Sequence, residues 1–353
     1  MEAQFHADYI GFVGTTSTNG SLGVYKIGLD TASTQLCVLD VRPAYNSGYL
    51  TLSPNKKRLY VLSEGMIFRG KASGGITAYN VEDGAFDEMD WAYTDGQRPC
   101  YVSCDEQAHE IYVANFFNGT LCVFDWLPDG SIGARKFYRA HEKLGPFGPS
   151  VHCVVKCPTG RYLAALEISG DIIYIYDCED GYKMVGSATT APMSGPRHMV
   201  FSPDGKFLYV NKQMDHQVSV FRFDPLRQPM LTEIQSISVR TEEMVGRTEP
   251  SAIRLCPGHD LLAVSNRGRD EYHADSVTLF QIDPDSGMLS RKQVLMTGGQ
   301  MPRDMNFTPD GQYLIVGYQA QNYLDIYRLD EKTQNLIYAG RGADIPSPVC
   351  IAF

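Results

Sequence analysis

Residues 198–213, HMVFSPDGKFLYVNKQ, contain the pattern that decides the fold. A short alternating apolar strand runs into the turn sequence SPDG, and a second alternating strand, FLYV, follows the turn. Period-two alternation on both sides of a tight turn predicts a β-hairpin. Five other stretches share this design: residues 49–64, 101–116, 153–168, 252–267 and 304–319.

These hairpins recur at the spacing of a repeat protein. Their turns are anchored 45 to 54 residues apart, at Pro54, Glu106, Pro158, Pro203, Pro257 and Pro309. A third apolar strand follows each hairpin, as in residues 119–126 and 322–329, and a weaker fourth strand follows that. Four short strands in about 50 residues are typical of one blade of a β-propeller.

The two ends of the chain supply a further blade. Residues 8–16 and 20–30 resemble later strands of a blade, and the terminal SPVCIAF (347–353) resembles an isolated first strand. We therefore predict an all-β fold, a seven-bladed β-propeller with four-stranded antiparallel blades, whose ring is closed by the N- and C-terminal strands. One domain over residues 1–353 is expected, with surface loops near 131–150, 240–250 and 267–275.

The net charge and the hydrophobic pattern of the chain limit the kinds of molecule that it is expected to bind. The formal net charge is −10 and no basic run interrupts it, which argues against nucleic acid. No apolar stretch approaches the roughly 20 residues of a membrane span, and the opening MEAQFHADYIGFVG lacks the pattern of a secretory leader. We expect a cytoplasmic protein, a monomer or weak homo-oligomer, that acts on a small anionic metabolite. No Cys/His spacing indicates zinc, and no motif indicates a cofactor or another metal.

Polar side chains gather where each hairpin opens. Six positions before each anchor the sequence has Gly48, Cys100, His152, Arg197, Ser251 and Arg303. The next residues are Tyr49, Tyr101, Cys153, His198, Ala252 and Asp304. Ten positions after each anchor come Glu64, Phe116, Ile168, Gln213, Arg267 and Gln319, with Glu167 one residue earlier in its repeat. A structural repeat does not itself require such residues, so this rim is the predicted site.

Three arginines in an acidic protein favour an anionic ligand. Arg197, Arg267 and Arg303 occupy equivalent positions of the repeat, and guanidinium groups pair bidentately with carboxylate or phosphate. The alternative is that each arginine holds a loop carbonyl or a neighbouring acid.

His152 is the candidate for proton transfer, because imidazole titrates near neutral pH. His198 follows Arg197 directly, so strand alternation predicts that it points to the opposite face. Glu64 and Glu167 are candidate acids or bases, or else partners of an arginine.

With these residues in hand, the chain resembles the lactonase family of seven-bladed propellers, which includes 6-phosphogluconolactonases and carboxymuconate lactonizing enzymes. The resemblance covers nearly the whole chain. The segments that carry it are FVGTT (12–16), RPCYVSCD (98–105), GPRHMVFSPDGKFLYV (195–210), VSNRG (264–268), GGQMPRDMNFTPDGQYLIVG (298–317) and PVCIAF (348–353).

The resemblance implies formation or hydrolysis of a lactone of an anionic sugar acid or diacid, without a dissociable cofactor. It places the catalytic set of the lactonizing members on His152, Arg197, Arg267 and the position of Gln213. The family commonly has Glu where this chain has Gln213, and a shift of one residue would place Lys212 there instead. Tyr101 stands where many members have His.

Three hypotheses follow. The first is a lactonase in which Arg197, Arg267 and Arg303 bind the anion and His152 moves the proton, while Tyr101, Glu64, Glu167, Lys212 and Gln319 contact substrate. The second is a cycloisomerase or lyase for a carboxylate substrate. The third is a propeller without catalytic activity that binds a metabolite or a protein.

Overall fold

In the computed structural model, the described residues are 5–143 and 148–353. The first four residues of the opening segment, and part of the loop expected at 131–150, lie outside them. The described chain forms 28 strands in seven four-stranded antiparallel sheets, with two short 3₁₀ helices at Glu82–Gly84 and Cys178–Asp180. The all-β, seven-bladed propeller fold predicted from the repeat is confirmed.

The chain divides into two compact units, which we describe separately. Unit 1 contains residues 1–48, 239–283 and 290–353, and unit 2 contains residues 49–238 and 284–289. The expectation of a single domain over residues 1–353 stays a prediction.

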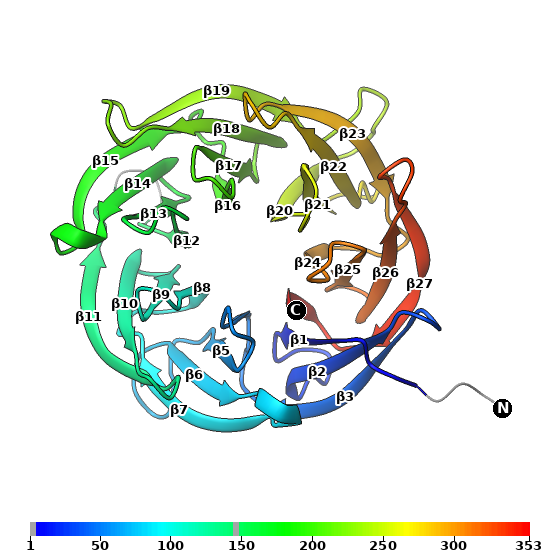
Figure 1. The fold of residues 1–353 in the computed structure, drawn as a ribbon, viewed down its shortest axis with the longest axis horizontal. Coiled ribbons are helices and arrows are strands. Elements are labelled where there is room, and N and C mark those ends of the chain that lie inside the picture. Colours follow the sequence, from blue (N-terminus) through cyan, green and yellow to red (C-terminus); the bar gives the residue numbers. More distant parts are fainter. Residues whose placement is uncertain (1–4, 144–147) are drawn as a thin grey trace. The chain divides into compact units, whose positions relative to one another are not determined.

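Unit 2 contains four sheets (Figure 1). Their strands are β4 (Tyr49–Leu52), β5 (Arg58–Ser63), β6 (Gly75–Asn80) and β7 (Asp87–Tyr93); β8 (Pro99–Asp105), β9 (Glu110–Asn115), β10 (Thr120–Trp126) and β11 (Ile132–Ala140); β12 (Val151–Lys156), β13 (Tyr162–Glu167), β14 (Ile172–Asp177) and β15 (Lys183–Thr189); and β16 (Pro196–Phe201), β17 (Phe207–Lys212), β18 (Gln217–Phe223) and β19 (Leu231–Ser238). The first strands of neighbouring sheets contact one another, β4 with β8, β8 with β12 and β12 with β16.

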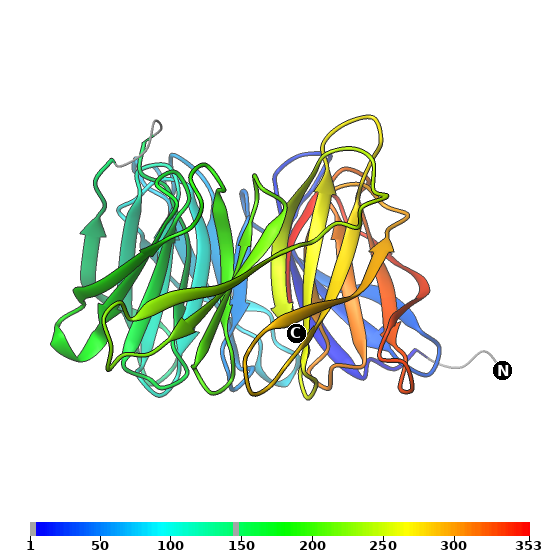
Figure 2. The ribbon, with the colours of Figure 1, turned by 90° about the horizontal axis from the view of Figure 1, so that it is seen from above.

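Unit 1 contains three sheets, and Figure 2 shows the antiparallel strands from a second direction. Their strands are β20 (Thr248–Leu255), β21 (Leu261–Gly268), β22 (Ser276–Ile282) and β23 (Leu289–Met296); β24 (Pro302–Phe307), β25 (Tyr313–Tyr318), β26 (Tyr323–Leu329) and β27 (Leu336–Asp344); and β28 (Pro348–Ala352), β1 (Tyr9–Thr15), β2 (Gly23–Asp30) and β3 (Gln35–Pro43). β28 pairs with β1, with Val13 opposite Ile351, which confirms that the two chain ends share a sheet.

Apolar side chains pack between adjacent sheets. In unit 1 a cluster joins Val13 and Ile351 of one sheet to Ile315 and Leu324 of the next, and all four are at most 1% exposed. The alternation that marks these strands in the sequence therefore reflects burial of their faces between neighbouring sheets.

The loop expected at residues 131–150 was partly wrong, because residues 132–140 form the fourth strand β11. This strand is mostly exposed, so its sequence lacks the apolar alternation of a buried strand. The other two expected loops are shorter than predicted, since β20 begins at Thr248 and β21 continues to Gly268.

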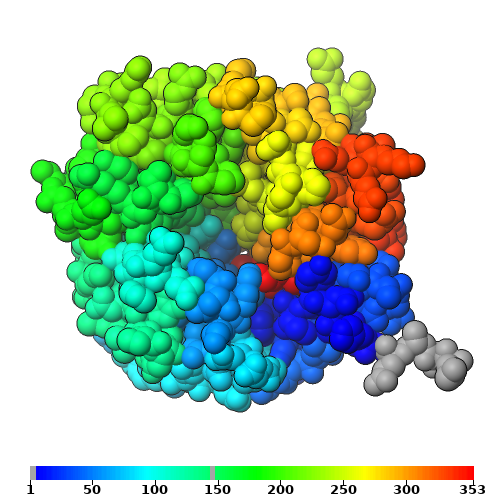
Figure 3. Space-filling model, viewed as in Figure 1, coloured from blue at the N-terminus to red at the C-terminus, as the bar shows by residue number. Residues whose placement is uncertain are grey.

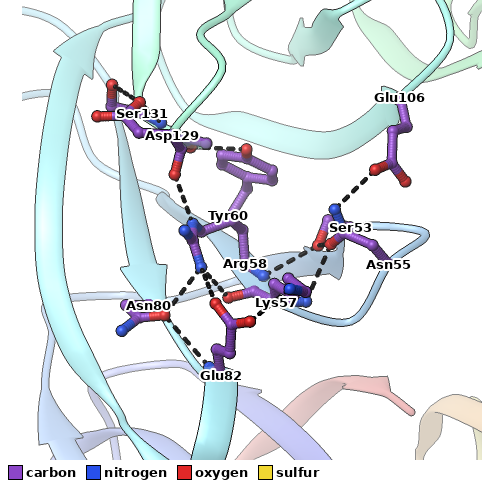
Figure 4. Close-up of polar contacts among 11 residues, drawn as sticks. Ser53, Asn55, Lys57, Arg58, Tyr60, Asn80, Glu82, Glu106, Asp129 and Ser131 are labelled. Carbon is purple, nitrogen blue, oxygen red and sulfur yellow. Dashed lines mark hydrogen bonds and ion pairs between the residues drawn. The ribbon is translucent and has the colours of Figure 1, made fainter.

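The turn ends of three hairpins share the same pattern of polar contacts. The hydroxyl of Ser202 donates to Asp204 at 2.6 Å and accepts the Phe207 N–H at 3.0 Å. Ser53 with Asn55 and Thr308 with Asp310 make the same contacts in their sheets. Figure 4 shows the Ser53 turn, together with Arg58 reaching to the neighbouring sheet. These turns fix the hairpin through local hydrogen bonds.

The opposite end carries a β-bulge at the second residue of the first strand. The register shifts between Pro99 and Tyr101, Val151 and Cys153, Pro196 and His198, and Pro302 and Asp304. A wider shift lies between Pro250 and Ile253. The extra residues in the four regular bulges are Cys100, His152, Arg197 and Arg303. A bulge leaves one residue out of the ladder and redirects its side chain.

Candidate functional site

The four sheets of unit 2 bring a histidine pair and a tyrosine pair together at the bulged end. The rings of His152 and His198 lie 5.2 Å apart. The rings of Tyr49 and Tyr101 stack at 4.5 Å, and the Tyr101 ring lies edge-on to His198 at 5.2 Å. With Arg197, which is 4% exposed, these side chains are all less than a tenth exposed. We call these five residues the His/Tyr/Arg cluster.

Arg197 and His198 point to the same side of their strand. The guanidinium Nη1 lies 3.3 Å from Nδ1 and 3.2 Å from Nε2 of His198. The prediction that His198 faces away was wrong, because the bulge between Pro196 and His198 breaks the alternation. The backbone N–H of His198 donates to Oδ1 of the buried Asn211 at 2.8 Å, and this hydrogen bond fixes the backbone at the bulge.

Glu167 holds the loop that leads into His152. Its carboxylate is fully buried and accepts the N–H of Ser150 at 2.6 Å, and also the N–H of Gly170. The hydroxyl and N–H of Ser169 donate to the same carboxylate. The predicted role of Glu167 as a substrate contact is not supported by this position, since its oxygens are committed to the backbone that carries His152.

Asp171 does the same for Arg197. Its Oδ1 accepts the Gly195 N–H at 2.9 Å, two residues before the arginine, and its Oδ2 accepts the N–H of Met193. Asp275 makes the equivalent contact in unit 1, accepting the Met301 N–H at 2.8 Å, two residues before Arg303. Each acid directly precedes the third strand of the preceding sheet, so one sheet positions the bulge of the next.

The structure places the remaining predicted residues of unit 2 with different partners. Glu64 follows β5 and forms an ion pair at 3.2 Å with Arg98, which is not one of the three arginines predicted at the rim. The ammonium of Lys212 is buried and lies 2.9 Å from both Asp215 and the Ser236 hydroxyl of the outermost strand β19. Lys212 is thereby turned toward the outer strands of its sheet, which does not support a substrate role.

Gln213 stays beside the candidate site through its backbone. Its N–H donates to the Gly195 carbonyl at 2.8 Å, which places this half-buried residue next to the loop before Arg197. Gln319 of unit 1 makes the equivalent bond to Met301 at 3.0 Å. The alignment of the repeats therefore placed both glutamines correctly relative to the bulges of their own sheets.

The two predicted arginines of unit 1 have different surroundings. Arg267 is 2% exposed and lies 3.2 Å from Glu249, which also pairs with Arg269 at 2.8 Å. The backbone of Arg303 is held by the Ser251 hydroxyl at 2.6 Å. For Arg267, the alternative that it pairs with a neighbouring acid holds in this structure. Arg267 and Arg269 therefore share the Glu249 carboxylate.

Sequence reasoning missed Glu249, Arg98 and the place of His198. Glu249 lies directly across from Arg267 in the ladder, two residues before the rim position Ser251. Extending the comparison of repeats by two residues would have found it. The contact between Arg197 and His198 had no such signal, because bulges are not visible in the hydrophobic pattern.

Thiolate chemistry is disfavoured at four cysteines. Burial raises the pKa of the thiols of Cys104, Cys122, Cys178 and Cys256 to about 12, so they stay protonated at neutral pH. Within residues 5–143 and 148–353, no group of three or more His, Cys, Asp or Glu side chains is arranged to hold a metal ion. In the same ranges, no helix is long and apolar enough to cross a bilayer.

The comparisons with known proteins agree with this architecture. The 6-phosphogluconolactonase of Bacillus subtilis is 29% identical, over 98% of both chains. The periplasmic gluconolactonase of Pseudomonas aeruginosa has a solved structure that superposes with a TM-score of 0.87 at 26% identity, covering 97% of this chain and 98% of that one. A solved protein from Lactobacillus plantarum superposes with a TM-score of 0.86 at the same identity and coverage.

The family model described as Lactonase, 7-bladed beta-propeller matches residues 10–353, nearly the whole chain. The chain therefore belongs to the lactonase family of seven-bladed β-propellers.

Proposed function

We propose that this protein is a lactonase that hydrolyses the lactone of an anionic sugar acid, such as 6-phosphogluconolactone. The observation that carries the proposal is the His/Tyr/Arg cluster, in which consecutive bulges bring His152 and Arg197 to one buried group around His198. Membership of the lactonase family supports the reaction class, and the name of the Bacillus subtilis relative supports the substrate class.

In the proposed reaction His152 acts first as a general base. It takes a proton from water while the water oxygen attacks the lactone carbonyl carbon. The Arg197 guanidinium stabilises the negative charge that develops on the carbonyl oxygen. The bond between the acyl carbon and the ring oxygen then breaks, and His152 returns the proton to that oxygen. The products are one carboxylic acid and one hydroxyl on the same molecule, and the acid ionises at neutral pH and releases one proton to solvent. No external reagent is needed beyond water.

The surroundings of the two residues suit these roles. His198 contacts Arg197 and its ring lies 5.2 Å from that of His152, so it helps to orient both. The stacked Tyr49 and Tyr101 rings form a flat wall beside His198, against which the C–H face of a sugar ring can pack. Tyr101, where many relatives have His, thus contributes a surface here in place of a second titratable ring.

Several expectations remain part of the proposal. Arg267, Arg303 and Gln319 are proposed contacts of the anionic substrate, and each is tested by its own substitution. We propose that the protein acts in the cytoplasm as a monomer or weak homo-oligomer. Its partner is proposed to be a small anionic metabolite, with no nucleic acid or membrane involved, because the chain is acidic and lacks a basic run.

The proposed function is tested by substituting two histidines, His152 at the bulged end of one hairpin and His109 at the turn end of another. Proton release from 6-phosphogluconolactone, above the uncatalysed rate, is measured for the wild type, His152→Asn and His109→Asn. His109 is exposed in the turn of the β8–β9 hairpin, where its φ of 51° suits Asn. We expect His152→Asn to lose at least 100-fold in kcat/KM and His109→Asn to keep wild-type activity.

Two results would contradict the proposal. Equal activity of the two variants would remove His152 from the reaction, and no turnover of phosphorylated or unphosphorylated sugar lactones by the wild type would remove the lactonase function. A muconate-type diacid measured in parallel tests the cycloisomerase alternative, which is supported only if that substrate alone is converted.

A further inference from the structure

A cavity of about 310 Å³ lies in unit 1, between the end of β23 and one face of the β24–β27 sheet, where the β26–β27 register shifts twice. Met296 and Gly298 line one side, and Tyr323, Asp325, Tyr327 and Tyr338 line the other. β27, coloured red in Figures 1 and 3, lies at the outer surface of this unit and contributes Tyr338 and Arg341 to the lining. This position is independent of the proposed lactonase site.

The floor of the cavity contains a buried carboxylate. Tyr323, Asp325 and Tyr327 alternate along β26 and therefore share one face, and Asp325 is 3% exposed. Burial raises the pKa of Asp325 to about 6, although the hydroxyls of Tyr318 and Tyr327 beside it lower that pKa by hydrogen bonding. The other charged group facing Asp325 is Arg341 of β27, which forms an ion pair with Asp344 at 2.7 Å. From β23 the facing groups, Leu295 and Met296, are apolar.

Comparison with other sheets shows why a carboxylate is unusual at this place. The equivalent residues of two other third strands are Cys122 and Thr278. Each donates to the backbone carbonyl of the residue that follows the fourth strand of the preceding sheet, Cys122 to Thr94 at 2.9 Å and Thr278 to Val239 at 2.6 Å.

Asp325 reverses this arrangement. By analogy with these two sheets, the carbonyl expected to face Asp325 is that of Thr297, which follows β23 and comes between the lining residues Met296 and Gly298 in the chain. An ionised carboxylate only accepts hydrogen bonds, so Asp325 cannot donate to that carbonyl as Cys122 and Thr278 donate to theirs. A group that carries several N–H donors and a positive charge would satisfy both acceptors.

The aromatic walls are also suited to a cation. The guanidinium of Arg341 already lies 4.0 Å from the centre of the Tyr323 ring, and the Tyr327 and Tyr338 rings lie 5.7 Å apart edge to face. Faces of aromatic rings attract cations, and the attraction strengthens where water is excluded. The cavity remains with Arg341 in this position, and its volume suits a small molecule.

We propose that this cavity binds a primary alkylammonium ion, whose N–H groups donate to Asp325 and to the Thr297 carbonyl while Tyr323, Tyr327 and Tyr338 surround its alkyl part. A quaternary ammonium ion fits less well, because it has no N–H to donate. A metal ion fits less well, because the walls offer rings in place of further oxygen ligands.

The test is a titration of the whole protein with methylammonium chloride at constant ionic strength, followed by calorimetry or by the tyrosine signals in NMR. We expect saturable binding at pH 7.5, at least tenfold weaker binding of tetramethylammonium, and a loss of affinity as the pH falls through about 6 and Asp325 takes up a proton.

Three variants separate this site from a general surface effect. Asp325→Thr installs the residue found at position 278, so the sheet should fold, and we expect it to lose binding at least tenfold together with its pH dependence. Tyr338→Ala should weaken binding. Tyr138→Ala is the control, because Tyr138 of β11 also carries an arginine over its ring, Arg135 at 5.0 Å, but belongs to another sheet.

The proposal is overturned if methylammonium does not bind, if Asp325→Thr binds as the wild type does, or if tetramethylammonium binds equally well. None of these results depends on lactone turnover, so failure here and failure of the proposed function are distinguishable.

Discussion

The two ends of the β16–β17 hairpin use polar residues in opposite ways. At the turn end, Ser202 and Asp204 bond each other and their own backbone, and the same pairing recurs at Ser53 and at Thr308. At the bulged end, Arg197 and His198 contact each other, and His198 reaches the rings of His152 and Tyr101 from two neighbouring sheets.

This difference separates the residues that stabilise the fold from the residues proposed to act on substrate. The turn end is satisfied locally, so the same short sequence serves in several sheets. At the bulged end, side chains contact side chains of other sheets. The residues there therefore differ from sheet to sheet, and the role of each depends on the residues that it contacts. Substitutions at the turn end should change stability, and substitutions at the bulged end should change activity.

The largest expected effect is at Arg197. Arg197→Lys keeps the charge but removes the planar guanidinium beside His198, and we expect kcat/KM for the lactone to fall about 100-fold with little change in Tm. The matched control is Arg222→Lys on the exposed face of β18 of the same sheet, which should leave both quantities unchanged. An active Arg197→Lys variant would show that the bulged end does not carry the reaction.

Substitution of Glu167 should have the next largest effect. Glu167 stabilises the fold and also positions the backbone that carries His152. Glu167→Gln replaces a fully buried carboxylate by a group that can accept at only one of its two polar atoms, and we expect a loss of about 3 kcal/mol in the free energy of unfolding. Denaturant unfolding measures this loss. Glu179→Gln, at a largely exposed position, is the control and should change stability by less than about 0.5 kcal/mol. A variant as stable as the control would mean that the loop before His152 needs no such anchor.

The contribution of Asp204 to stability at the turn end should depend on pH. Burial raises its pKa, but hydrogen bonds from Ser202 and Lys206 lower it more, to about 2 against an ordinary value of 3.8. The depressed pKa means that its stabilising contribution is present above pH 4 and is lost as the pH falls toward 2. The side chain is 45% exposed, so after allowance for solvent screening we expect Asp204→Ala to cost only about 1 kcal/mol at pH 7.

Thermal melts of the two proteins at pH 7 and pH 2.5 give this comparison. The difference in stability should shrink at the lower pH, while lactone turnover at pH 7 stays unchanged. A constant difference across this range would show that the carboxylate charge is not what holds the turn.

Gln213→Glu should have the smallest effect. This change introduces the carboxylate that the family resemblance implies at this position, next to the loop before Arg197. We expect kcat/KM to change by less than about tenfold, with a new acidic limb near the ordinary carboxylate pKa of about 4 in its pH profile. A profile that matches the wild type would indicate that position 213 does not contact the reacting groups.

The fold could be predicted from the sequence because its information is local and repeated. The stretch 198–213 shows its hairpin by alternation around a turn, its five counterparts give six blades, and the two chain ends supply the seventh. The strand β11 was missed because it is exposed, and burial is what produces a readable pattern. The bulge residues His152, Arg197 and Arg303 were found by alignment of the repeats, which needs no knowledge of their direction.

The contacts of the candidate site could not be predicted in the same way. Strand alternation placed His198 on the wrong face, since a bulge changes the side-chain direction without changing the hydrophobic pattern. Lys212 and Glu167 occupy rim positions in the aligned repeats. Lys212, however, contacts the hydroxyl of Ser236, which is distant in the chain. Glu167 accepts a hydrogen bond from the backbone N–H of Ser150, which lies in a loop. Such partners are set by packing between strands, which composition and spacing do not encode.

The most direct test of the central claim is a crystal structure of the protein with 6-phosphogluconate, the product of the proposed reaction. The account predicts that the new carboxylate lies within hydrogen-bonding distance, about 3 Å, of both Arg197 and His152, with the sugar against Tyr101. A product bound elsewhere, with the His/Tyr/Arg cluster left without contact to it, would contradict the account.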